Sequence, residues 1–272
     1  MQATARERAG RALARLGAAL VVLFTVLPLW VMVVLSLDPV AGGADGVGLW
    51  PSRLSLRNYD LLASPVFGFY PTLERSVLLS VGTTLVSLLV AVPAGYALAR
   101  LPVRGRARIL ALLIGLAFFP GIVLEVPLSV LFSDVGLLDR LVGIGLAQLS
   151  FTVPLAVWFL AYGFRSVPVE VEEAAQVDGA STTQRIVRVV LPMARPAVVG
   201  TTILVFVASW NDFVFSANLN RTKRSETLPT LLAKLPDVGF LGGRMAASVL
   251  MCIPVAVLVG VLLRWLSRRA EA

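Results

Sequence analysis

The residue types that usually carry out catalysis are scarce in this sequence. It contains no histidine and one cysteine, Cys252, so it lacks the commonest general base and metal ligand and cannot form an internal disulfide. It also lacks the G-x-x-x-x-G-K-[ST] loop that binds nucleotide phosphates. We therefore expect no catalytic residue, no metal and no bound cofactor in this chain.

Polar side chains inside long apolar stretches are the first candidates for a function. Four such residues are Glu125, Gln148, Asn211 and Asp212. An ionised carboxylate that faces lipid costs about 2.5–3.5 kcal/mol or more, so Glu125 and Asp212 are expected to face the bundle interior or the outer mouth. These four residues are candidates for a solute translocation path. Structural pairing inside the bundle is the alternative interpretation.

A second group of candidates lies in the polar segment 164–196. Pro168 is tolerated in the first turn of a helix, and three glutamates follow at the positive end of the helix dipole: Glu170, Glu172 and Glu173. Gly179 readily adopts the left-handed conformation that ends helices. The segment therefore begins with a short, acidic helix that ends at a glycine.

The residues after this glycine predict a second helix. Ser181 and Gln184 have the spacing of a capping box, and Leu191-Pro192 is expected to end the helix. One face of the first helix carries small apolar residues at helical spacing: Val171, Ala174 and Ala175. We therefore expect two short helices joined at a glycine, with a flat surface that suits docking into a groove of another protein.

The elements that position these candidates belong to a membrane protein. Of the 272 residues, 57% are hydrophobic and 15% charged, with a mean hydropathy of +0.85, whereas soluble domains are about a quarter charged. A spanning helix needs about 20 apolar residues. Six stretches reach that length: residues 16–37, 76–99, 109–132, 141–163, 197–219 and 245–266. We predict an all-α membrane protein with six transmembrane helices.

The basic residues predict how these helices are oriented. Six spans place both termini on one side, and that side holds the larger share of the 24 Lys and Arg residues. Because basic residues concentrate on the cytoplasmic side, both termini are expected in the cytoplasm. The arginines are not interleaved with aromatic residues, so the net charge of +8 indicates membrane topology, with no nucleic acid as a partner.

The polar segment has a recognisable spacing. It reads Glu173-Ala174-Ala175, three residues, Gly179, nine residues and Val189-Val190-Leu191-Pro192. This spacing resembles the EAA loop of ABC importer permeases, with Val189 where that family usually has isoleucine. Three further short segments resemble the permeases of the carbohydrate importers within that family. They are Trp210-Asn211, Asn58-Tyr59 and Tyr96-Ala97-Leu98-Ala99-Arg100. Over nearly its whole length the chain resembles the second permease subunit of maltose-type transporters.

The resemblance implies a type I importer transmembrane domain in the cytoplasmic (inner or plasma) membrane. Its function would be the ATP-driven, binding-protein-dependent import of a sugar or sugar derivative. The implied partners are two copies of an ATP-binding subunit, a second homologous permease and an extracytoplasmic solute-binding protein. ATP and Mg²⁺ would be used by the ATPase partner, since this chain has no phosphate loop.

The resemblance also implies which residues couple the permease to the ATPase. Glu173 would pair with a basic residue of the ATPase, and Gly179 would supply the bend. The expected coupling residues are Glu172, Glu173, Ala174, Ala175, Asp178, Gly179, Ala180, Leu191 and Pro192. The alternative for Glu173 is that it only stabilises the N-terminus of its helix.

We expect one permease domain over residues 1–272, with an extra N-terminal helix at 1–40, a five-helix core at 73–266 and the coupling loop at 164–196. In the outer loops, Trp50 and Tyr59 are interpreted as aromatic anchors at the membrane interface. Residues 220–243 are the favoured contact with the binding protein.

Other functions stay open at this point. An ABC permease for another small solute, such as a phosphate ester or peptide, has the same EAA loop. An ion-coupled secondary transporter would use the intramembrane acids Glu125 and Asp212, but inverted repeats are not apparent. A membrane scaffold without transport activity is a third alternative.

Overall fold

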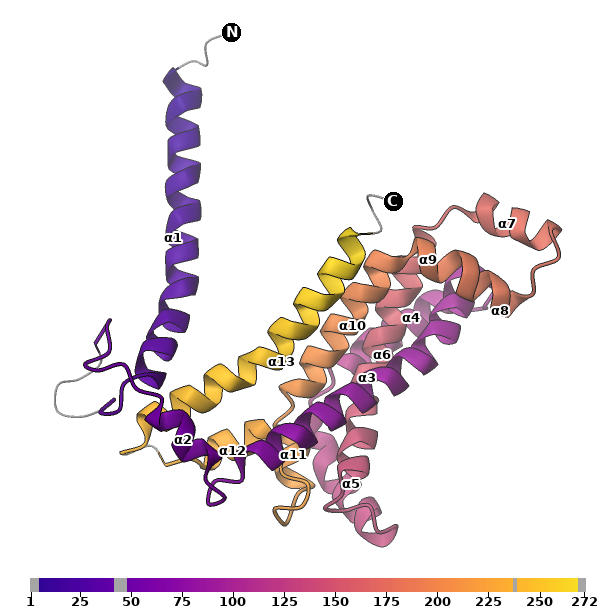
Figure 1. Cartoon of the computed structure of the whole chain (residues 1–272). Helices are drawn as coiled ribbons and strands as arrows, with labels where there is room; N and C mark the ends of the chain where they lie inside the picture. Colours follow the sequence, from indigo (N-terminus) through magenta and orange to yellow (C-terminus); the bar gives the residue numbers. More distant parts are fainter. Residues whose placement is uncertain (1–4, 42–47, 237–238, 269–272) are drawn as a thin grey trace. The chain divides into compact units, whose positions relative to one another are not determined.

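The computed structural model describes residues 5–41, 48–236 and 239–268. The regular elements in these ranges are helices (Figure 1). The chain divides into two units, one formed by Met1–Phe69 with Lys234–Cys252 and the other by Tyr70–Ala233 with Ile253–Ala272. The expected division into residues 1–40, 73–266 and 164–196 stays a prediction.

The first unit contains α1 (Ala5–Ser36), α2 (Arg57–Ala63) and the beginning of α13 (Leu241–Ser267). The loop after α1 is tied to α2 by Asn58, whose amide donates to the carbonyls of Ser36 (3.0 Å) and Asp38 (2.9 Å). Gly242 lies so close to Asn58 that a Cβ there would be 2.5 Å from the amide nitrogen. A side chain at position 242 would therefore displace the Asn58 amide from these two hydrogen bonds.

The carboxylate of Asp38 organises the same loop. It accepts hydrogen bonds from the backbone N–H of Ser52 (2.8 Å), from the Ser52 hydroxyl (2.8 Å) and from the N–H of Val40 (3.1 Å). The bond from the Ser52 backbone is the largest cause that lowers the pKa of Asp38 below its usual value, and burial partly opposes it.

The second unit contains most of the remaining helices. They are α3 (Phe69–Arg100), α4 (Arg106–Ala117), α5 (Gly121–Asp134), α6 (Leu141–Arg165), α10 (Arg195–Trp210), α11 (Val214–Asn218) and α12 (Leu228–Lys234). Helices α4 and α10 both pack on α6, and Figure 1 shows α3, α4, α6 and α10 side by side. At the contact of α6 with α10, a Cβ on Gly163 would meet the Cβ of Ala197 at 2.3 Å.

Five of the six predicted membrane helices are confirmed in approximate position, and the sixth corresponds to a bent pair of helices. Within the described ranges, five helices are long and apolar enough to span a membrane, or up to six if the bent pair α4–α5 is one span. Helix α3 begins at Phe69 and is 32 residues long, so it starts before the expected residue 76. The N-terminal span is Leu13–Ser36.

The third predicted span, residues 109–132, is wrong as a single helix. Helices α4 and α5 are bent by 82° at a short break between them. Pro120 lies at this break, in an extended conformation just before α5. Because proline has no N–H and disfavours a helical residue before it, the helix is interrupted here. The expected span 197–219 corresponds to one span, Arg195–Asn218, which contains α10, a short break and α11.

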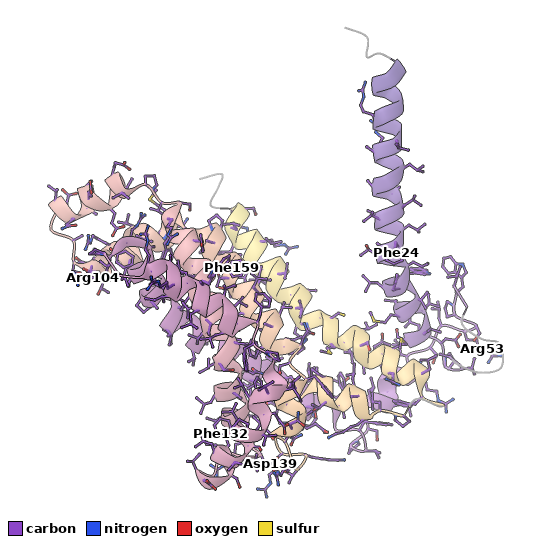
Figure 2. All side chains as sticks on the ribbon, turned by 180° about the vertical axis from the view of Figure 1, so that it is seen from behind. Phe24, Arg53, Arg104, Phe132, Asp139 and Phe159 are labelled. Atoms are coloured by element: carbon purple, nitrogen blue, oxygen red, sulfur yellow. The ribbon has the colours of Figure 1, made fainter. Side chains whose placement is uncertain are left out.

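The two ends of the second unit carry different residues. Figure 2 shows Arg104 at one end, and Phe132 and Asp139 at the opposite end. In Figure 1 the helices of the polar segment lie at the same end as the α3–α4 connection, which contains Arg104. The basic connection 100–108 and the polar segment therefore share one side of the helix bundle.

Candidate functional site

The polar segment folds into the expected two helices joined at a glycine. Helix α7 (Val169–Val177) follows Pro168, and Gly179 has a φ of +84°, in the left-handed region. Helix α8 (Thr182–Arg185) begins with a complete capping box. The Gln184 N–H donates to the Ser181 hydroxyl (3.3 Å), and the Ser181 N–H donates to the Gln184 side chain (2.8 Å).

The second helix ends at Met193, one residue beyond the expected end at Leu191-Pro192. A π-helical stretch (Ile186–Val190) and α9 (Leu191–Met193) continue α8, and the turn comes only at Ala194. Pro192 directly follows the π-helical stretch, where the regular backbone hydrogen-bond pattern is already interrupted, so the helix accommodates this proline. Leu191 is partly buried and, like Val190, packs in the core of the second unit.

The neighbouring residues Glu172 and Glu173 have different surroundings. Glu172 is buried, and its carboxylate forms an ion pair with Arg100 Nε on α3 (3.1 Å) and lies 3.8 Å from Arg185 Nη1 on α8. It also accepts a hydrogen bond from the Tyr96 hydroxyl. Glu173 is exposed. It forms no hydrogen bond or ion pair with any residue in the described part of the chain.

The surface between the two short helices is concave, so the expected flat surface is wrong. The bend at Gly179 folds α8 back toward α7, and Arg185 Nη1 holds the two together by donating to the Gln176 side chain (2.7 Å). A hollow of about 370 Å³ results. It is lined by Ala175, Asp178, Gly179, Ala180, Gln184, Arg188 and Val189.

The remaining face of α7 is not covered by any residue that the structure describes. Val171 is 42% exposed and Val177 is 88% exposed, and Ala174 is exposed beside them. Exposed apolar residues of this kind, bordered by charged residues, are typical of surfaces that bind another protein. Four expected coupling residues line the hollow and Glu173 lies outside it, so most of the predicted set is available to a partner.

A polar network occupies the interior of the helix bundle, with Gln148 at its centre. Gln148 is fully buried. Its side-chain oxygen accepts hydrogen bonds from the hydroxyls of Thr83 (3.2 Å) and Ser209 (2.6 Å). Its amide donates to the Ser209 carbonyl (3.3 Å) and to the Asp212 carboxylate (3.1 Å). The network therefore connects α3, α6 and the end of α10.

Asp212 belongs to this network and also lies at the break between α10 and α11. Its carboxylate accepts hydrogen bonds from the N–H groups of Phe215 (3.3 Å) and Ser216 (3.2 Å), which satisfies the start of α11. It also contributes to a cavity of about 180 Å³ whose wall includes Ser150, Phe151 and Phe215. The two aromatic rings are stacked with their centroids 6.2 Å apart.

The other two path candidates lie apart from this network. Asn211 is exposed, and its amide donates to the Val207 carbonyl of its own helix (3.0 Å). Glu125 is partly buried on α5. It makes no hydrogen bond or ion pair within residues 5–41, 48–236 and 239–268. The structure thus brings Gln148 and Asp212 together and leaves Glu125 and Asn211 outside.

The small-residue stripe of α3 packs inside this chain. Ser76, Ser80, Thr83 and Ser87 are buried. The Ser87 hydroxyl donates to Thr152 on α6 (2.9 Å), and the Ser76 hydroxyl accepts from the N–H of Leu228 at the start of α12 (2.8 Å). Small polar residues permit this close approach of helices.

The loop that follows α11 is anchored at the other end of the bundle. Arg75 donates to the carbonyls of Lys223 (2.7 Å) and Arg224 (3.2 Å), and Asp139 accepts hydrogen bonds from Thr222 and Ser225. Burial raises the pKa of Asp139, but these hydrogen bonds outweigh burial and hold the pKa below its usual value. The tip 221–224 stays exposed.

The two residues expected to be aromatic anchors at the membrane interface, Tyr59 and Trp50, have different contacts. Tyr59 is bonded to the Ser36 hydroxyl (2.8 Å), whereas Trp50 is exposed and makes an edge-to-face contact with Trp30 at 5.2 Å.

Reasoning from the sequence missed several residues of these networks. Tyr96 and Arg100 were noticed only as part of a family-like run, and their contact with Glu172 spans more than seventy residues of chain. Ser209 was not selected because one serine in an apolar helix is unremarkable. The only available sequence signal was its spacing, three residues before Asp212.

Comparison with known proteins gives a consistent group of relatives. The sequence profile of the family described as "Binding-protein-dependent transport system inner membrane component" matches residues 4–272. The trehalose transport system permease protein SugB of Mycobacterium tuberculosis is 32% identical over 250 residues, 88% of each chain. The trehalose/maltose transport system permease protein MalG of Thermococcus litoralis is 31% identical over 254 residues, 91% of this chain and 90% of the relative.

A solved structure has the same fold. It is a chain of a bacterial ABC transporter involved in the import of the acidic polysaccharide alginate. The TM-score is 0.78 at 22% identity, and the match covers 97% of this chain and 99% of the other. The MetNI methionine ABC transporter gives a TM-score of 0.61 at 16% identity, over 74% of this chain and 95% of the other. Over the matched residues, these chains therefore share one arrangement of helices although few of their residues are identical.

Proposed function

We propose, from the premise that this chain belongs to the binding-protein-dependent transport system inner membrane component family, that its solute is a sugar. The family membership makes the chain a multi-pass permease of the inner membrane, a translocation subunit. The support for a sugar is that relatives aligned over most of this chain are permeases named for trehalose and maltose transport. A small oligosaccharide is the class of solute that we propose.

We infer that the polar segment 164–196 is the contact with an ATP-binding subunit. The single observation that carries this role is the exposed surface of the loop, which presents Glu173 and a separate hollow lined by Asp178, Gly179 and Ala180. Glu173 is unpaired among the described residues, so its charge is free to meet a cation on the partner. ATP and Mg²⁺ belong to that partner, because this chain has no phosphate loop.

The proposed orientation places this loop and both termini in the cytoplasm. It is supported by the position of Arg104, which lies at the same end of the second unit as the polar segment (Figure 2). Basic residues at one end of a membrane bundle favour the cytoplasmic side. Asp139 and the loop that it anchors then face the outside.

For the solute path, the geometry favours Asp212 and Gln148. A carboxylate, a serine and two stacked aromatic rings at one cavity are groups that bind the hydroxyls and the apolar faces of sugars. Glu125 and Asn211 lie outside the network, and in the proposed path they are wall residues.

The proposed assembly contains this chain, a second homologous permease, two ATP-binding subunits and an external solute-binding protein. The exposed cations at the loop tip support the last partner, since Arg221, Lys223 and Arg224 are held outward by Asp139 and Arg75. A basic tip fits an acidic surface on a binding protein.

The test is to purify the tagged chain from its native membrane in mild detergent and to identify what accompanies it. We expect an ATPase and a second permease of similar size. The complex is then placed in proteoliposomes with the binding protein, and ATP-dependent uptake of radiolabelled trehalose and maltose is measured. A chain that is recovered alone, or that moves solute along an ion gradient without ATP, would overturn the proposal.

A further inference from the structure

Helix α7 is attached to the rest of its unit mainly through one side chain. All residues of α7 are described, and among them Glu172 alone is buried. The segments before and after α7 pack in the core of the second unit, since Val167 and Val190 belong to the same buried cluster as Tyr96. Between Val167 and Val190, α7 projects from the helix bundle, and Glu172 is the residue of α7 that contacts the bundle.

The contacts of Glu172 lead directly to a membrane-spanning helix. Tyr96 and Arg100 lie on successive turns of the last part of α3, and both bind the Glu172 carboxylate. Arg100 also donates to the Val167 carbonyl (2.5 Å), just before α7 begins. The end of α3 therefore holds both the start of α7 and its inner face.

A third contact joins α8 to the same carboxylate. Arg185 lies 3.8 Å from Glu172 and donates to Gln176 (2.7 Å), so it bridges the two short helices. The side chains of Glu172, Arg100 and Arg185 are 6%, 10% and 16% exposed. The buried Glu172 carboxylate thus lies between two partly buried arginine side chains, and its neutralisation leaves both cations without their shared anion.

We propose that Glu172 is the positioning residue that makes α7 and α3 move as one piece, so that displacement of α7 by a docked ATPase reaches the membrane through Tyr96 and Arg100. This inference rests on the proposed function for its physiological meaning. The two neighbouring glutamates then have different roles. Glu173 contacts the ATPase partner, whereas Glu172 attaches α7 to α3 within the permease.

The experiment measures the distance between α7 and α3 directly. Spin labels are attached at Val177→Cys on α7 and Leu89→Cys on α3, both highly exposed positions, in a Cys252→Ser background. Pulsed electron resonance is recorded on the detergent-purified complex without nucleotide and after trapping with ATP and vanadate. We expect one narrow distance distribution that is the same in both states.

Glu172→Gln is the test variant, and Glu170→Gln is the matched control, since Glu170 is an exposed residue of the same helix. In Glu172→Gln, the distribution of distances between the two labels should be broad even without nucleotide. Trapping with ATP and vanadate should then change its mean distance. Glu170→Gln should match the parent. Glu172→Asp, which keeps the charge, should restore most of the narrow distribution even if the glutamine variant is recovered in poor yield.

A second readout separates positioning from general stability. In the Glu172→Gln complex, the uptake of radiolabelled trehalose or maltose per ATP hydrolysed should fall about tenfold relative to the Glu170→Gln complex. A narrow distance in Glu172→Gln that equals the Glu170→Gln control would overturn the inference. If no ATPase is recovered with any variant, the proposed function fails, but the nucleotide-free distances still decide the role of Glu172.

Discussion

Replacement of Gln148 by leucine tests the polar network inside the bundle. Gln148 makes four hydrogen bonds, two with side-chain hydroxyls, one with the Ser209 carbonyl and one with Asp212. Leucine has a similar volume, so the main loss is of polar contacts. Hydrogen bonds between membrane helices contribute about 0.6 kcal/mol each on average. The expected loss of unfolding free energy is therefore about 2–3 kcal/mol.

The assay is reversible unfolding of the purified chain in mixed micelles by increasing SDS, followed by tryptophan fluorescence. Trp210 is 2% exposed and adjoins the network, so its exposure to solvent contributes to the fluorescence change of the five tryptophans. Asn211→Leu is the control, because its amide binds only its own helix, and it should change stability by less than about 0.5 kcal/mol. A Gln148→Leu protein as stable as the parent would refute the structural role assigned to the network.

Three further outcomes are expected. Gly163→Ala should destabilise the chain by about 1–3 kcal/mol in the same assay, because its Cβ would lie 2.3 Å from that of Ala197; Ala197→Gly should rescue it, and Gly115→Ala, which faces open space, should have no such effect. The lowered pKa of Asp139 means that its ionised form stabilises the fold above its unfolded pKa, and this stabilisation is lost as pH falls through the folded pKa. Stability measured from pH 6 down to about pH 2 should therefore fall more steeply in the parent than in Asp139→Asn, and equal slopes would contradict the assignment. Gly179→Ala should reduce ATP-driven uptake more than Gly179→Asn does, since asparagine tolerates the observed φ of +84°; equal uptake would show that the bend does not need this conformation.

The membrane helices were predictable because their signal is local. Long apolar stretches give the spans, and Pro120 marks the place where the third span breaks. The bend of 82° was not predictable, because its direction depends on how α5 packs against α11 and not on the residues at the break. The capping box at Ser181 was predictable for the same reason as the spans, since both of its members lie within four residues.

The distinct roles of Glu172 and Glu173 were not predictable from their types or spacing. Both are glutamates in the first half of one helix, and a rotation of about 100° per residue separates their directions. Only the position of Tyr96 and Arg100, far away in the sequence, determines which carboxylate turns inward. The second helix of the polar segment ends at Met193, one residue after the expected Leu191-Pro192. The π-helical stretch before it was not predictable from the proline, because it depends on how this segment packs on the rest of the second unit.

The measurement that tests the central claim most directly compares Glu173→Lys with Glu170→Lys. Both glutamates are exposed on α7, and each variant changes the charge by the same amount. Co-purification of the ATPase and ATP-driven sugar uptake are measured for both. The account predicts that Glu173→Lys loses ATPase binding and uptake while still inserting in the membrane, and that Glu170→Lys keeps both. Uptake by Glu173→Lys at the level of the parent would contradict the role of this loop in coupling.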